Sequence, residues 1–131
     1  MFPIGILSER AGVNIETIRY YERVGILPKA ERGENGRRVY VDKDVRRLSF
    51  VRHARGLGFE LKAVRELLRL QEQPERSCKT ASRMATAQLV AVQSKIERLK
   101  RLRLELTRMV NECKNGRVAE CRVIDALAAA V

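Results

Sequence analysis

The sequence predicts a mainly α-helical protein in which a small N-terminal unit precedes one long helix in the C-terminal half. Three observations predict this class. Apolar residues recur at alternating steps of four and three between residues 85 and 113, glycine and asparagine bound two short helices near the N-terminus, and an Asn-Gly pair marks one β-hairpin. The predicted organisation therefore has three parts, residues 1–74, 75–112 and 113–131.

Two short helices are expected at the N-terminus, over residues 4–11 and 15–23. Gly12 accepts the left-handed conformation that ends the first helix, and Asn14 is a preferred cap for the second. Two short helices joined by a tight turn that contains glycine are typical of a helix-turn-helix, whose second helix enters the major groove of DNA. The outward face of that helix is expected to carry Thr17, Arg19 and Tyr20.

A β-hairpin is expected next, because the pair Asn35-Gly36 is the strongest short hairpin signal in the chain. This hairpin would form a wing beside the helix-turn-helix. It would carry Arg37, Arg38 and Tyr40.

Two further helices are expected after the hairpin. Asp42 is predicted to cap a third helix that Gly56 ends, and a fourth helix is predicted over residues 61–70, before the break at Pro74. The core of this unit is expected to consist of apolar residues from the second half of the unit: Val45, Leu48, Val51, Leu57, Phe59, Val64, Leu67 and Leu68.

The long helix, expected from Lys79 to Glu112, has the apolar spacing of a coiled-coil seam, with one step of seven across Arg103. An amphipathic helix of this length in a chain of 131 residues needs a partner, so the protein is expected to form an obligate homodimer. The predicted dimer interface consists of Leu89, Val92, Ile96, Leu99, Leu106 and Val110.

The three cysteines lie near the ends of this seam: Cys78 before it, Cys113 at its far end and Cys121 eight residues beyond. A helix rises about 1.5 Å per residue, so Cys78 and Cys113 of one chain would lie roughly 50 Å apart. Two copies packed antiparallel would bring Cys78 of one chain beside Cys113 and Cys121 of the other. This arrangement predicts two three-thiolate metal sites per dimer, against the plainer interpretation that Cys113 is a small apolar seam residue and the others are incidental.

The charge of the chain indicates a polyanionic partner. With 27 Lys and Arg against 16 Asp and Glu the formal charge is +11, which makes nucleic acid the leading partner and a solvated or ribosome-associated basic surface the alternative. The sequence has one histidine and no nucleophile that a motif places beside a base, so an enzyme is not expected. No stretch approaches the roughly 20 apolar residues of a membrane span, and a cytoplasmic protein with reduced thiols is expected.

Four blocks carry a family resemblance: residues 17–22 (TIRYYE), 25–28 (GILP), 35–40 (NGRRVY) and 50–59 (FVRHARGLGF). The chain resembles the MerR family of transcription activators, specifically its metal-sensing branch. One departure is Arg37, where the family more often has tyrosine. The resemblance implies a winged helix-turn-helix over residues 1–74, an antiparallel coiled-coil dimerisation helix over residues 75–112, and a metal-binding loop with a short helix over residues 113–131.

The resemblance also implies a mechanism. In the family, the dimer sits on a promoter whose spacer is too long for RNA polymerase, and metal binding makes the dimer bend and untwist that double-stranded DNA so that the promoter becomes usable; the apo form binds DNA without activating. Residues implied to contact DNA are Thr17, Arg19 and Tyr20 in the recognition helix, Arg37, Arg38 and Tyr40 in the wing, and His53 and Arg55 in the third helix.

The identity of the ion is narrowed by position 78. Within the family a serine there accompanies monovalent copper, whereas a cysteine accompanies divalent ions, and three thiolates also balance a +2 charge better. Because the loop after Cys113 offers only Glu120 as a further ligand, lead, mercury or cadmium is favoured over zinc. The alternatives are a copper sensor, a regulator whose cysteines respond to oxidation, and a constitutive architectural DNA-binding protein.

Overall fold

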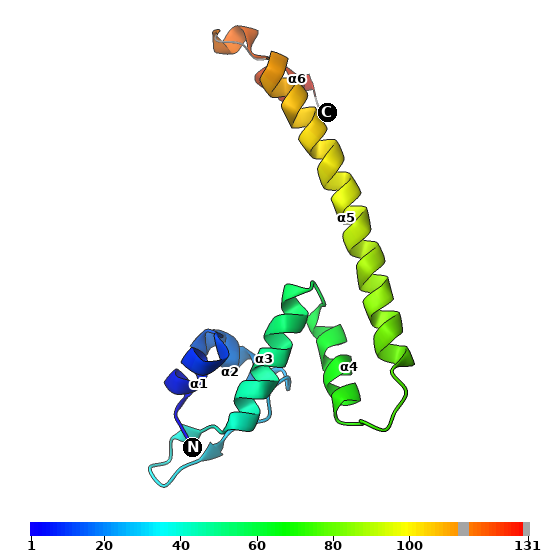
Figure 1. The fold of residues 1–131 in the computed structure, drawn as a ribbon. Helices are drawn as coiled ribbons and strands as arrows, with labels where there is room; N and C mark the ends of the chain where they lie inside the picture. Colours follow the sequence, from blue (N-terminus) through cyan, green and yellow to red (C-terminus); the bar gives the residue numbers. More distant parts are fainter. Residues whose placement is uncertain (113–115, 130–131) are drawn as a thin grey trace. The chain divides into compact units, whose positions relative to one another are not determined.

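The computed structural model describes residues 1–112 and 116–129, which fall into two compact units, Met1–Met84 and Ala85–Val131. Figure 1 shows a chain of helices with one small hairpin, which confirms the predicted mainly α-helical class. In chain order the elements are α1 (Ile4–Ala11), α2 (Ile15–Arg23), β1 (Glu31–Arg32), β2 (Arg38–Val39), α3 (Asp42–Gly56), α4 (Leu61–Gln71), α5 (Lys79–Glu112), the 3-10 helix η1 (Val118–Glu120) and α6 (Arg122–Ala129).

The turn between α1 and α2 has the predicted chemistry. Gly12 adopts a left-handed φ of 67°, and its N–H donates to the Ser8 carbonyl at 2.9 Å. A Cβ at this position would lie 2.3 Å from Nη1 of Arg52, whose flexible side chain can move, so it is the left-handed backbone that favours glycine here. Asn14 caps α2, because its Oδ1 accepts hydrogen bonds from the N–H groups of Glu16 at 2.8 Å and Thr17 at 3.3 Å.

The predicted hairpin forms from β1 and β2, which pair antiparallel with Glu31 opposite Val39 and Arg32 opposite Arg38. Gly36 supplies the left-handed φ of 76° that the turn needs. Next to β2, the backbone of Phe2 forms an antiparallel bridge with Tyr40, through hydrogen bonds of 3.0 and 2.8 Å. The start of the chain is therefore bound to the base of the wing.

Two capping predictions for α3 are wrong. Asp42 is the first residue of the helix and pairs with Arg10 at 2.8 Å, whereas the backbone N–H of Val41 is capped by Asp44 Oδ2 at 2.9 Å. At the other end Gly56 is still helical, and the left-handed residue that stops the helix is Gly58, with a φ of 90°. Its N–H and that of the next residue reach back to the last carbonyls of α3, which is the usual Schellman arrangement.

The core of the first unit lies where α1, α2, α3 and α4 meet the wing. Of the predicted core residues, Leu48, Val51, Val64 and Leu68 are fully buried, while Val45, Phe59 and Leu67 pack against them partly exposed. Leu57 is 66% exposed and lies outside the core, because it falls in the capping turn after α3. The remaining buried apolar residues are Leu7, Ala11, Ile18, Tyr21, Ile26, Leu27, Tyr40 and Ala54.

Three arginines attach the helix-turn-helix to the rest of the unit. Arg52 Nη1 donates to the Ala11 carbonyl at 3.3 Å, Arg47 Nε to the Ile26 carbonyl at 2.6 Å, and Arg65 Nη2 to the Val24 carbonyl at 2.6 Å. Each acceptor lies at or just beyond the end of α1 or α2, where carbonyl groups lack helical partners. These bonds fix α2 on the scaffold of α3 and α4.

The second unit contains most of α5, which begins at the predicted residue, and α6, which contacts η1. None of the side chains of α5 is buried. Five of the six predicted interface residues are exposed in the single chain, and Val92 is half-buried. In the described part of the chain, no helix is both long enough and apolar enough to cross a membrane.

Candidate nucleic-acid interface and metal-ligand cysteines

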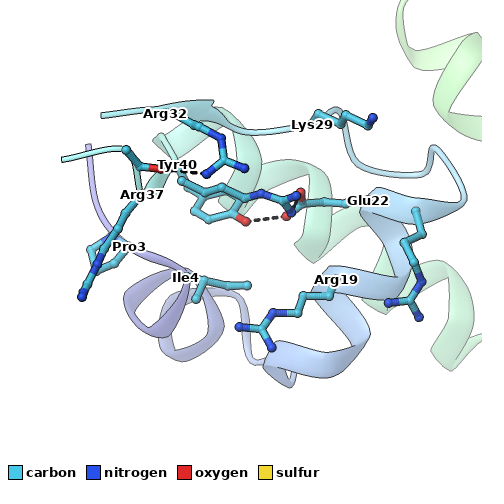
Figure 2. Close-up of a pocket in the computed structure, with 11 residues that line it drawn as sticks. Pro3, Ile4, Arg19, Glu22, Lys29, Arg32, Arg37 and Tyr40 are labelled. Atoms are coloured by element: carbon cyan, nitrogen blue, oxygen red, sulfur yellow. Dashed lines mark hydrogen bonds and ion pairs between the residues drawn. The ribbon is translucent and has the colours of Figure 1, made fainter. Parts of the chain in front are cut away.

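A groove of about 990 Å³ separates the recognition helix α2 from the wing. Figure 2 shows Arg19 of α2 on one side of this groove, with Arg32 and Arg37 of the hairpin on the other. Six of its eleven lining residues are basic, and a strongly basic groove attracts the phosphates of a nucleic acid. The lining consists of Pro3, Ile4, Arg19, Glu22, Arg23, Lys29, Arg32, Gly36, Arg37, Arg38 and Tyr40.

The one acidic residue in this lining is engaged by two residues of the wing. Glu22 lies in the last turn of α2, and its side chain is only 3% exposed. Its Oε2 accepts from Arg38 Nη1 at 2.7 Å, and its Oε1 accepts from the Tyr40 hydroxyl. Burial and, after it, this hydrogen bond raise the pKa of Tyr40 to about 12.

The structure brings four of the predicted DNA-contact residues to the groove. Arg19 and Arg37 are exposed there and remain available for phosphate or base contacts, while Arg38 is exposed but paired with Glu22 at 2.7 Å. Tyr40 is different, because it is 1% exposed and its hydroxyl is already bonded to Glu22. The prediction that Tyr40 reaches DNA directly is not supported by this geometry, which places the side chain inside the unit.

The other predicted contact residues lie outside the groove lining. Thr17 is half-buried on α2, and Tyr20 is exposed, with the Arg23 guanidinium 5.8 Å from the centre of its ring. His53 and Arg55 are exposed in the last turn of α3, where Arg55 Nη1 donates to the Phe59 carbonyl at 3.0 Å. DNA contact by these four residues stays a prediction.

Four groove residues were missed by the sequence analysis: Glu22, Arg23, Lys29 and Arg32. A signal existed for two of them. Glu22 follows buried Ile18 by four residues, which puts it on the inward face of α2, and Arg32 pairs with Arg38 across the expected hairpin. These two residues could have been identified from their positions on the expected helix and hairpin, in addition to their residue types.

The three cysteines are divided between the two units, one in the first and two in the second. Cys78 is exposed in the first unit, directly before α5, where Phe50, Leu67 and Leu70 help to line a shallow apolar hollow beside it. Cys121 is half-buried at the start of α6 in the second unit, and Cys113 lies outside the described residues. Among the residues that the structure describes, no three His, Cys, Asp or Glu side chains gather closely enough to hold a metal ion.

The fold and the groove define a class of protein: a regulator that binds DNA through a winged helix-turn-helix. Two family models match the chain. The model of the MerR HTH family regulatory proteins matches residues 2–71, and the model described as MerR, DNA binding, matches residues 45–109. The chain belongs to the MerR family. It is therefore a DNA-binding transcription regulator and not an enzyme, as the sequence predicted.

Several similar proteins of this family are associated with metals by their names or by the ions in their solved structures. The chain is 39% identical to the mercuric resistance operon regulatory protein of Bacillus cereus, over 96% of both chains, and 35% identical to the regulator ZntR of Escherichia coli K12, over 97% of this chain and 92% of that one. It also resembles the solved structure of PbrR691 from Ralstonia metallidurans in complex with lead(II), with a TM-score of 0.81 and 31% identity over 97% and 99% of the two chains. A structure of MerR from Bacillus megaterium with mercury(II) matches with a TM-score of 0.68 and 32% identity, over the same shares.

Proposed function

We propose that this regulator senses a thiophilic divalent ion through Cys78, Cys113 and Cys121, with each site shared between two protomers. The observation that carries the proposal is the placement of these cysteines about the unpaired apolar face of α5. The ion is lead, mercury, cadmium or zinc, and relatives associated with mercury and lead support this range. Ligand thiolates require a reducing compartment, so we also propose that the protein acts in the cytoplasm.

The seam itself supports a shared site. In an antiparallel pair, one register matches each seam position between 85 and 110 with another: Ala85 with Val110, Leu89 with Leu106, Val92 with Arg103, and Ile96 with Leu99. Continued along the chain, the same register sets position 78 of one protomer opposite position 117 of the other. Position 117 is four residues from Cys113 and four from Cys121. One register thus closes the apolar seam and directs the segments that carry the three thiols to the same end of the dimer, which supports the proposal.

The donor set suits soft divalent ions. Deprotonated thiols are soft ligands, and three of them carry more negative charge than a monovalent ion needs in a partly buried site. Cys78 is exposed and adjoins an apolar hollow, so a partner chain could cover it. A fourth ligand is not required for the trigonal geometry that lead and mercury accept.

The groove supports the second half of the proposal, in which the dimer distorts promoter DNA. Arg19 of α2 and Arg37 of the wing lie on opposite sides of one groove, so each protomer can hold a stretch of duplex at two points. Bending a site of 20 to 30 base pairs costs of order 1 to 6 kcal/mol, which a difference in metal affinity between two DNA-bound states can supply. The metal-bound dimer would then activate RNA polymerase at an overlong spacer, and the apo dimer would repress.

The direct test is transcription by RNA polymerase from the regulator's own promoter, with purified dimer under reducing conditions. Lead, mercury, cadmium, zinc and monovalent copper are added separately at matched free concentrations. A response to divalent thiophilic ions supports the proposal, whereas a response to copper alone would mean that the sensed ion is monovalent copper. Activation by peroxide without metal would indicate a thiol redox regulator, and equal promoter distortion with and without metal would indicate an architectural protein.

Shared coordination has its own test. A Cys78→Ser chain and a Cys113→Ser/Cys121→Ser chain, each inactive as a homodimer, regenerate one intact site in a mixed dimer. We expect the purified mixed dimer to bind one ion, against two for the unsubstituted dimer and none for either mutant homodimer. Absence of metal binding in a verified mixed dimer would rule out coordination between protomers.

A further inference from the structure

Glu22 is the buried charged residue of the described chain, and it connects the two parts of the groove. It comes from the recognition helix, whereas both of its partners come from the wing: Arg38 lies in β2 and Tyr40 follows that strand. Figure 2 shows the Tyr40 ring and the Glu22 carboxylate meeting between the helix and the hairpin.

A buried carboxylate is a costly way to join two elements. Removing an ion from water costs several kcal/mol, and apolar side chains of similar volume often stabilise a fold better. What a carboxylate provides is direction, because its two oxygens each accept one hydrogen bond along a defined line. Glu22 therefore fixes where β2 stands relative to α2, and hence the width of the groove.

The same pairing changes the electrostatics of the groove. The side chain of Arg38 is 44% exposed, so its guanidinium faces both the Glu22 carboxylate and the groove. A cation that already has a partner attracts a random phosphate less strongly than a free one. The network thus restrains attraction to DNA of any sequence while holding Arg19 and Arg37 at a set separation.

We propose that Glu22 is a positioning residue that holds the wing against the recognition helix and thereby raises the preference of the dimer for its own DNA site over other DNA. The proposal rests on the assignment of this groove to DNA. A rigid pair of contacts binds a matching site without the cost of ordering the wing, whereas non-specific binding depends on charge alone.

The test is Glu22→Gln. Glutamine keeps the shape of the side chain and an acceptor for the Tyr40 hydroxyl, but it removes the charge that engages Arg38. Binding is measured to a duplex selected from a random library by the unsubstituted dimer, and to mixed-sequence genomic DNA. We expect affinity for the selected duplex to fall at least about tenfold, while affinity for mixed DNA stays level or rises.

Two further variants keep the result interpretable. Glu9→Gln makes the same charge change at an exposed site on α1 outside the groove, and it should leave the ratio of the two affinities unchanged. Tyr40→Phe removes only the second hydrogen bond and keeps the buried ring, so it should lower the ratio in the same direction by a smaller factor. This variant also tests the proposal if the glutamine protein does not fold.

A double-mutant cycle separates positioning from stability. Arg37→Ala should weaken binding to the selected duplex in the unsubstituted protein, and by a clearly smaller factor in Glu22→Gln, because the wing is no longer held in place. Equal factors in the two backgrounds, or equal losses on selected and mixed DNA, would overturn the positioning role. A wild-type dimer that prefers no duplex would overturn the groove assignment itself.

Discussion

The first unit and the long helix α5 differ in how they bury apolar side chains. The first unit closes a core within one protomer, where Leu48, Val51 and Val64 have no exposed surface. The helix α5 buries none of its side chains, and Leu99, in the middle of its seam, is 60% exposed. The comparison indicates that the DNA-binding unit folds by its own contacts, whereas the long helix depends on association. Control of the assembly can therefore act on the helix without unfolding the unit that holds DNA.

The largest effect is expected from a charge in the seam. Ile96→Asp removes apolar burial worth about 1.5–3 kcal/mol twice per dimer and places two carboxylates in the interface. We expect dissociation and a loss of helical circular dichroism, with the first unit still folded. Sedimentation velocity measures the first change. Ser94→Asp, which carries the same charge off the seam, should remain dimeric, and dissociation of that control would argue against the predicted seam.

The complementary change is made in the core. Leu48→Ala leaves a cavity in the first unit and should lower its free energy of unfolding by about 2–5 kcal/mol. Thermal or urea denaturation measures this loss, while the dimer should persist. Leu57→Ala is the matched control, because Leu57 is the same residue type but 66% exposed, and it should change stability by less than about 0.5 kcal/mol. Similar losses in the two variants would contradict the assignment of Leu48 to the core and of Leu57 to the surface.

High pH should act on the first unit. The pKa of Tyr40 is raised from 10.0 to about 12, so the folded unit holds this proton more tightly than the unfolded chain does. The resulting stability is complete below pH 10 and is lost as the pH rises toward 12, by about 2 kcal/mol. Denaturation on both sides of pH 10 measures the slope. Tyr40→Phe should be less stable at neutral pH, but its free energy of unfolding should depend less on pH between 10 and 12. An equal slope in both proteins would contradict the assignment of this pH dependence to Tyr40.

The smallest expected effect is an increase in the stability of the dimer. Arg103 occupies a seam position, where a charged side chain weakens a coiled coil but fixes its register. Arg103→Leu should strengthen the dimer by about 1 kcal/mol per protomer or more, as measured by sedimentation equilibrium. Arg101→Leu, off the seam, should not. A weaker dimer in Arg103→Leu would mean that the arginine has a partner across the interface.

Much of the fold could be predicted because its signals are local. Asn14 and Gly12 act on their own neighbours, and the helical pattern of α5 repeats over many turns, so the turn after α1 and the long helix were predicted correctly. The seam on α5 stays a prediction. Asp42 and Leu57 were misread because tertiary context decided between close alternatives. Asp42 pairs with Arg10, while Asp44 caps the start of α3. Leu57, although apolar, falls in the turn after α3 in which Gly58 adopts its left-handed conformation.

The candidate site was predictable in outline and not in its central interaction. The basic residues of α2 and the wing follow from the family motif, but the role of Glu22 depends on Arg38 and Tyr40, which are 16 and 18 residues away. No local pattern links those positions, and a carboxylate on the inward face of a helix is normally disfavoured. The three-cysteine site remains a prediction, since it would join residues of two protomers.

The bridge between Phe2 and Tyr40 has a practical consequence for handling this protein. It holds the first residues at the base of the wing, and Pro3 and Ile4 line the basic groove (Figure 2). Any purification tag joined before Met1 would emerge at the mouth of that groove, where a histidine-rich or acidic segment could compete with nucleic acid. Binding constants obtained with an N-terminal fusion would then describe the tag as much as the regulator, so the tag should be cleaved before such measurements.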